Sequence, residues 1–187
     1  MDSYKKPCFD SSVFIGGLGD GEICRGIKRK VVFDWLWQRA KDGAFEVYVS
    51  AITLAEVYKT KRNTNIATEP SVLDEFLERI EEPFVKIIEV DRQTGLDAHA
   101  LCCKYSANKL WPNDALQLAC ALSAGCDVLL AWDRPLVEVN HDRIRIEEPS
   151  IYEKDMLPAI EIATEEEIKA YEDKRKRQAT VRGIPTL

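Results

Sequence analysis

The sequence has little of the chemistry that histidines and paired cysteines provide. Among 187 residues there are two histidines, His99 and His141, and six cysteines that form no Cys-x-x-Cys pair. Zinc sites and histidine-based catalytic triads need such residues, so the sequence favours neither kind of site. Several cysteines lie in apolar segments such as LQLACALSAGC, which is typical of reduced, buried thiols in a cytosolic protein. Catalysis would therefore depend on carboxylates.

The chain also lacks a long apolar run, an internal repeat and a low-complexity tract. No stretch approaches the roughly 20 apolar residues that span a bilayer, and the apolar run in the N-terminal segment is too short for a secretory signal. We therefore expect a cytoplasmic protein with no membrane segment. Hydrophobic residues make up 45% of the chain and charged residues 31%, which predicts a single folded domain with a real core.

A positive overall charge is absent too, because the formal net charge is -6 at pH 7. Phosphate binding needs local positive charge rather than a positive total. Residues 25–41, RGIKRKVVFDWLWQRAK, hold six Lys or Arg and one Asp, and Lys59, Lys61 and Arg62 follow shortly after Glu56. Two basic stretches therefore flank a set of acidic residues that includes Glu56.

Short β-branched runs alternate with helical patterns along the chain, which predicts an α/β domain with a central parallel sheet flanked by helices on both faces. Strands are expected at residues 7–11, 45–49, 84–90, 127–132 and, as a short edge strand, 143–147. Helices are expected at residues 25–41, 52–62, 71–81, 92–106 and 112–125. Residues 11–15 continue the first apolar segment, and a glycine-rich loop at 16–21 ends it.

The character of the sequence changes after Pro149. Residues 164–178, TEEEIKAYEDKRKRQ, open with a Thr164/Glu167 capping box and are almost wholly polar. We therefore divide the chain into a domain at residues 1–149 and a charged, helical C-terminal extension at residues 150–187. The pattern favours a solvated helix lying against the domain, and a partner-binding arm is the alternative.

Four acidic side chains fall where a parallel sheet gathers its ligands, beyond the carboxyl ends of the strands. Asp10 lies near the end of the first strand, and Asp133 directly follows DVLLAW. Asp114 is about the third residue of the helix that Pro112 opens, where the helix dipole favours a negative charge. Glu56 sits one turn into the helix after the second strand. Taken singly, each acid is more simply a turn, cap or dipole-complementing residue.

Taken together, the four acids predict a cation site. Glu56 lies in the largely apolar AITLAEVY, where an ionised carboxylate needs a partner or a metal. Four carboxylates in one place repel one another strongly unless a divalent cation neutralises them. Ligation by oxygen alone favours Mg²⁺ or Mn²⁺.

Three segments resemble, in order and approximate spacing, the three blocks of PIN-domain nucleases, including the VapC-like toxins of toxin-antitoxin pairs: FDSSVFI at 9–15, SAITLAEVY at 50–58 and NDALQLACALSAGCDVLLAWD at 113–133. The resemblance covers about residues 7–147. It implies that the catalytic metal ligands are Asp10, Glu56, Asp114 and Asp133. It also implies a PIN-like fold, a Mg²⁺- or Mn²⁺-dependent endoribonuclease activity and, as partners, RNA, an antitoxin protein and a second copy of the chain.

The chain departs from this pattern in three respects. The third block ends Ala131-Trp132-Asp133, whereas such toxins often end Thr-Arg-Asp, so a hydroxyl near the site is lost. Other residues could supply that hydroxyl, although each is more simply a turn or cap residue: Ser11, Ser12, Ser50 and Thr53. The glycine-rich loop and the segment after Pro149 have no counterpart in the resemblance.

The chemistry expected of such a site is metal-assisted hydrolysis of a phosphodiester bond. Basic residues beside the acids are candidates for positioning the RNA backbone, with solvated surface charge as the alternative: Lys59, Lys61, Arg62 and Arg134. A phosphatase with an aspartyl nucleophile needs a second Asp two residues after the first, and position 12 is Ser. The segment at 17–21 matches neither a P-loop nor GxGxxG. The rival class is a PIN fold that holds RNA or a protein without cutting.

Overall fold

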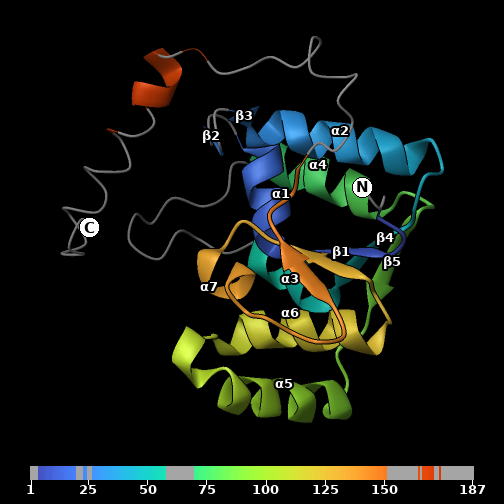
Figure 1. Cartoon of the computed structure of the whole chain (residues 1–187). Helices are drawn as coiled ribbons and strands as arrows, with labels where there is room; N and C mark the ends of the chain where they lie inside the picture. Colours follow the sequence, from blue (N-terminus) through green and yellow to red (C-terminus); the bar gives the residue numbers. More distant parts are fainter. Residues whose placement is uncertain are drawn as a thin grey trace.

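The fold is built on a central sheet of five strands, in the order β5-β4-β1-β6-β7, with every neighbouring pair parallel (Figure 1). The computed structural model of the chain describes residues 4–19, 23–24, 27–57, 70–150, 164, 166–170 and 173. The strands are β1 (Pro7–Phe9), β4 (Val47–Ser50), β5 (Val85–Ile88), β6 (Val128–Leu130) and β7 (Arg145–Glu147). The predicted parallel sheet is confirmed, with the 143–147 segment at its edge as expected.

Helices connect the strands and cover both faces of the sheet. They are α1 (Ser11–Leu18), α2 (Arg29–Lys41), α3 (Ala51–Val57), α4 (Pro70–Ile80), α5 (Arg92–Lys104), α6 (Pro112–Ser123) and α7 (Arg134–Val137), with a 3-10 turn η1 (Ser106–Asn108). A short antiparallel pair, β2 (Ile23–Cys24) and β3 (Ile27–Lys28), precedes α2. The predicted glycine stop of α6 is Gly125, whose φ of 67° is a backbone angle that favours glycine.

Alternate strand residues point into two separate hydrophobic clusters. Phe9, Val49 and Leu130 pack in the cluster with α1, α2 and α4, whereas Cys8 and Leu129 pack in the cluster with α5, α6 and α7. This alternation is the period-two pattern of a strand that is buried on both faces. Figure 1 shows α2 and α4 on one side of the sheet and α5 and α6 on the other. Helix α3 contacts both α1 and α6, so it lies where the two layers meet.

The first segment after β1 differs from the prediction. Residues 11–15 were expected to continue the apolar strand segment and 16–21 to form a glycine-rich loop, but Ser11–Leu18 is helical and includes Gly16 and Gly17. Asp10 caps this helix by accepting a hydrogen bond from the Ser12 backbone N–H. A Cβ added to Gly17 would lie 2.3 Å from the Phe33 ring, so the glycine allows α1 and α2 to pack closely. Close packing, rather than a turn, accounts for these glycines.

Other element boundaries also differ. The helix predicted at 25–41 begins at Arg29, because Ile27 and Lys28 pair with β2 instead. The helix predicted at 52–62 is seen as Ala51–Val57, and its continuation from residue 58, with Lys59, Lys61 and Arg62, lies outside the described residues. Helix α7, one turn long, was not predicted.

The described helical turn of the C-terminal extension begins with the predicted capping box. The Thr164 backbone N–H donates to Glu167 Oε2 at 2.9 Å, and the Glu167 N–H donates to Thr164 Oγ1 at 3.2 Å. Lys28 Nζ lies 3.0 Å from Glu167 Oε1, so this helical turn meets the domain beside β3. The division between residues 149 and 150 stays a prediction. Within the described segments, none of the helices is long and apolar enough to cross a membrane.

Candidate functional site

The register of the sheet brings three chain segments together at one edge. Phe9 of β1 pairs with Val49 of β4 on one side and with Leu130 of β6 on the other. The backbone N–H of Asp10 then donates to the Leu130 carbonyl at 3.0 Å. Asp10, the start of α3 and the segment leading to Asp133 therefore leave the sheet at the same level, as the topology of a parallel sheet requires.

Asp10 is buried at this edge, with 2% of its surface exposed. Its Oδ2 accepts a hydrogen bond from the Ser12 N–H at 2.9 Å. Burial raises the pKa of Asp10 to about 7, the bonds from Ser12 oppose that rise, and the charges of Asp133 and Glu56 add to it. The ionised form of Asp10 is thus disfavoured by both its burial and its neighbours, which is the situation that a bound cation relieves.

Glu56, on α3, is held by two amides from α6. Asn113 Nδ2 donates to Glu56 Oε1 at 2.8 Å, and Gln117 Nε2 donates to Glu56 Oε2 at 3.1 Å. Gln117 Nε2 also donates to Thr53 Oγ1 at 2.9 Å. The predicted need of Glu56 for a polar partner is therefore met within the protein. The Oε1 atom of Gln117 is buried beside this group and has no hydrogen-bond partner among the described residues.

The sequence patterns did not identify Asn113 and Gln117 as residues of this site. Both carried a signal: Asn113 directly precedes Asp114, and Gln117 is an amide within the apolar run ALQLACAL. Gln117 is fully buried, and a fully buried amide needs hydrogen-bond partners, which are here on α3.

Asp114 lies in the first turn of its helix, as predicted, and Asp133 lies after β6 at the start of α7, a helix that was not predicted. Asp114 is the third residue of α6, in its first turn, and is half-buried. The pKa of the Cys102 thiol is raised mainly by burial, next by the neighbouring Cys103, and then by the charge of Asp114. Asp133 is exposed at the N-cap of α7 but makes no side-chain capping bond there. Capping therefore explains Asp10 in part, whereas it does not explain Asp133.

The hydroxyl side chains near this edge connect neighbouring elements. Ser12 Oγ accepts the Trp132 backbone N–H at 2.9 Å, which ties α1 to the segment between β6 and α7. Ser50 Oγ accepts the Ile52 N–H at 3.3 Å and donates to Cys120 Sγ at 3.2 Å. Ser50 thus caps the start of α3, as its simpler interpretation predicted, whereas the Ser12 hydroxyl joins two elements that are far apart in the sequence.

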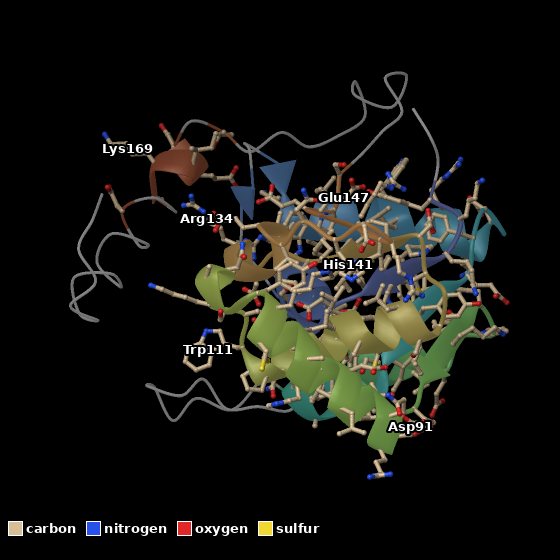
Figure 2. The ribbon with its side chains drawn as sticks, turned by 60° about the horizontal axis from the view of Figure 1, so that its bottom comes forward. Asp91, Trp111, Arg134, His141, Glu147 and Lys169 are labelled. Atoms are coloured by element: carbon tan, nitrogen blue, oxygen red, sulfur yellow. The ribbon has the colours of Figure 1, made fainter. Side chains whose placement is uncertain are left out.

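Two arginines lie beside the acidic residues. Arg134 is the first residue of α7, its side chain is 87% exposed, and its Nε lies 2.6 Å from Glu138 Oε1. Figure 2 shows Arg134 at the surface. The Arg29 guanidinium stacks over the Trp132 indole, 4.7 Å from the ring centroid. Positive charge is therefore present next to Asp133.

The chemistry of the four acidic side chains suits a hard divalent cation. Their donors are all oxygens, and the pKa of Asp10 rises partly because Asp133 and Glu56 are close to it. Within the described segments, no three His, Cys, Asp or Glu side chains form a ready-made group that could hold an ion. The donor set matches Mg²⁺ or Mn²⁺, which take carboxylates and retain waters.

Comparisons with known proteins agree with this architecture. The profile of the PIN domain matches residues 8–142. A search of curated protein sequences gave no significant match. The fold is similar to a chain in the crystal structure of VapBC2 from Rickettsia felis bound to a DNA fragment from their promoter, with a TM-score of 0.52 and 17% sequence identity over 78% of this chain and 99% of that chain. The extent of the domain match shows that this chain belongs to the PIN-domain family.

Proposed function

We propose that the chain is a metal-dependent endoribonuclease that hydrolyses RNA phosphodiester bonds. The observation that carries the proposal is Asp10, a buried carboxyl at the carboxyl edge of a parallel sheet whose pKa is raised by burial and by the charges of Glu56 and Asp133. Membership of the PIN-domain family supports a nuclease. Asp10, Glu56, Asp114 and Asp133 are the residues proposed to hold Mg²⁺ or Mn²⁺, which when bound supplies an activated water and offsets the charge that develops on the phosphate.

The residues around the acids would orient them. Asn113 and Gln117 fix both oxygens of Glu56, and the Ser12 N–H fixes one oxygen of Asp10. Such outer contacts determine how carboxylates present their oxygens to an ion. Arg134 is proposed to contact the RNA backbone beside Asp133. The same role is proposed for Lys59, Lys61 and Arg62, which lie outside the described residues.

RNA cleavage tests this proposal. Wild-type protein and Asp10→Asn are incubated with single-stranded RNA in Mg²⁺, in Mn²⁺ and in EDTA, and folding of both is checked by circular dichroism. We expect cleavage by the wild type in either metal, none in EDTA, and a loss of about 100-fold or more in Asp10→Asn, because a proposed metal ligand is removed. Unchanged cleavage by a folded Asp10→Asn would contradict the assignment.

One observation favours a second candidate, a PIN fold that binds RNA or a protein without cutting. The described acids do not form a ready-made metal group. A binding module would hold RNA in Mg²⁺ and leave it intact for hours, whereas a nuclease would shorten it. Intact RNA that remains bound would decide for the binding module.

A toxin role adds further partners to the proposal. The sequence resembles toxins of toxin-antitoxin pairs, and the fold is shared with a chain of a VapBC2 structure that holds promoter DNA. We therefore propose an antitoxin as protein partner, a homodimer as assembly and the cytoplasm as compartment. A small protein encoded next to this chain is expected to co-purify with it and to suppress cleavage. Full activity in the presence of that protein would contradict the toxin role.

A further inference from the structure

Trp111 occupies a position that neither burial nor helix capping explains. It is 66% exposed, the largest exposed fraction among the big hydrophobic residues that the structure describes. It is the N-cap residue of α6, and its side chain makes no capping hydrogen bond. Ser, Thr, Asp and Asn are strongly preferred at such positions because their side chains cap the helix. A tryptophan at this position thus provides no side-chain cap and does not bury its ring. Its presence therefore points to a role other than stability.

The backbone that carries Trp111 is fixed close to the acidic residues. On its N-terminal side, Leu110 is buried, and the Asn108 amide donates to the Glu138 carbonyl at 3.1 Å, just after α7. On its C-terminal side, Asn113 binds Glu56 at 2.8 Å. Trp111 therefore lies between α7, which begins after Asp133, and the amide that holds Glu56. In Figure 2, Trp111 and Arg134 project from the same side of the molecule.

Trp111 is flanked in the chain by Leu110, which is buried, and by Pro112. Polar residues lie just beyond them, Lys109 on one side and Asn113 and Asp114 on the other. The other exposed large hydrophobic residues belong to different elements or their flanks: Ile15 on α1, Leu77 on α4, Ile87 and Val90 in or after β5, and Leu96 on α5. Leu96 lies about two turns before the end of α5. Protein interfaces have an apolar centre built from several residues. A single exposed indole with no other exposed large hydrophobic residue on its helix instead suits a flat ligand that stacks on it with one face.

We propose that Trp111 is a stacking platform for a nucleobase of single-stranded RNA whose phosphate backbone reaches the acidic site. The proposal rests on the proposed function, in that it takes RNA as the ligand of this edge of the sheet. Bases of a single strand stack on exposed aromatic side chains with little regard to sequence. Trp111 would bind the strand next to the reacting phosphate and set where it lies, while the carboxylates carry the reaction.

Trp111→Ser separates this role from a structural one, because serine removes the ring and supplies a helix cap. Binding of a fluorescein-labelled ten-nucleotide RNA of mixed sequence is measured by anisotropy in EDTA and in Ca²⁺. We expect the Kd of Trp111→Ser to rise about tenfold, while its melting temperature equals or exceeds that of the wild type. Trp111→Phe should retain affinity to within about threefold. The matched control is Leu96→Ala, which removes another exposed apolar side chain and should bind as the wild type does.

A modified RNA tests stacking itself. Replacing single bases with abasic sites should weaken binding to the wild type at one position or two adjacent positions, and the same RNAs should bind Trp111→Ser no more weakly than the intact strand does. In cleavage assays, Trp111→Ser should raise KM about tenfold and change kcat by less than about threefold, because the ring binds the strand in the ground state and transition state alike.

The outcomes distinguish the stacking platform from the nuclease proposal. Equal RNA affinity of Trp111→Ser and wild type overturns the platform, and cleavage by the same wild-type preparation leaves the nuclease proposal standing. Binding that depends on Trp111 without any cleavage supports the platform and overturns the nuclease. A change in oligomeric state with unchanged RNA affinity would make the indole a protein contact and overturn the platform. A wild type that binds no RNA overturns both.

Discussion

Asp10 has two roles that shift its pKa in opposite directions. The Ser12 hydrogen bonds at the start of α1 favour the ionised carboxylate, and burial together with the charges of Asp133 and Glu56 disfavours it. Burial outweighs the cap, so the pKa of Asp10 rises to about 7. The chain thus keeps an unfavourable carboxyl at the edge of its sheet. That cost to stability is expected of a group retained for function.

The raised pKa of Asp10 predicts how stability depends on pH without metal. Below about pH 4 the group is protonated in both the folded and unfolded chain. As pH rises from about 4 to about 7, the unfolded chain ionises while the folded chain resists, so the contribution of Asp10 to the free energy of unfolding falls by an amount on the order of 4 kcal/mol. Asn caps helices as well as Asp does. Asp10→Asn should therefore be more stable than the wild type at pH 8 and similar to it near pH 4.

Urea unfolding in EDTA at pH 4 and pH 8 measures this dependence. Asp97→Asn on the exposed face of α5 serves as the control and should follow the wild type at both pH values. A constant difference between Asp10→Asn and the wild type at the two pH values would contradict the raised pKa.

Gln117 shows what the sequence could and could not predict at the residue scale. The positions of the four acids at the carboxyl edge followed from strand and helix patterns, and their role as ligands stays a prediction. The two amides on Glu56 depend on how α3 packs against α6, which no local pattern encodes. Tertiary hydrogen bonds of this kind require the arrangement of elements to be known first.

Replacing Gln117 with leucine should weaken metal binding. The change removes the donor to Glu56 Oε2 and Thr53 Oγ1 at similar side-chain volume. Loss of an orienting partner of a metal ligand typically costs about 10- to 100-fold in affinity. Isothermal titration with Mn²⁺ measures it. Gln93→Leu removes a similar bond, from the Gln93 amide to Asp97 on α5, and should leave Mn²⁺ affinity unchanged. Equal affinity of Gln117→Leu and wild type would show that this amide does not orient a ligand.

At the scale of elements, the sequence patterns gave a wrong prediction for α1. Glycines usually indicate turns, so Gly16 and Gly17 suggested a loop. The structure instead uses them inside a helix, because the Phe33 ring lies against the backbone of Gly17 and the Arg29 side chain against Gly16. Phe14 on the same helix packs edge-on against Phe76, with ring centroids 5.2 Å apart. A contact between helices can thus override the local preference of glycine.

Two glycine-to-alanine changes test this explanation of α1. Gly17→Ala should destabilise the protein by about 1–3 kcal/mol or more, since its Cβ would lie 2.3 Å from the Phe33 ring. Gly95→Ala, in α5, meets nothing within 4 Å and should stabilise the protein by about 0.5–1 kcal/mol, because alanine favours helix. Urea midpoints of the two variants should move in opposite directions. A Gly17→Ala protein as stable as the wild type would refute close packing.

At the scale of the whole molecule, alternation of strands and helices predicted the parallel sheet and the edge that carries the acids. The basic run at 25–41 was harder to interpret, because ion pairs within its own helix and with other elements offset some of its charge. Lys30 pairs with Asp34 at 3.0 Å, and Arg79 on α4 approaches the same aspartate at 3.6 Å. Part of the basic run therefore balances acidic side chains on and near α2, which lowers its value as a phosphate-binding surface.

The predicted division after residue 149 can be tested by truncation. Among the few residues of the extension that the structure describes, Glu167 meets the domain in an ion pair with Lys28, and the two side chains are 44% and 28% exposed. Pairs of this kind contribute about 0–1 kcal/mol. A protein ending at residue 149 should therefore keep the melting temperature to within a few degrees and keep RNA cleavage. Loss of folding in that protein would make the extension part of the domain, and loss of cleavage alone would give it a part in the reaction.

The central claim is that four carboxylates from separate elements together form a site for divalent cations, and Mn²⁺ binding tests it most directly. Titration calorimetry compares the wild type with Asp10→Asn, Glu56→Gln, Asp114→Asn and Asp133→Asn, each confirmed to be folded, and with Asp97→Asn as control. We expect a wild-type site that each of the four changes weakens at least about tenfold, with no effect of the control. A wild type that binds no divalent ion, or variants that bind as it does, would contradict the claim.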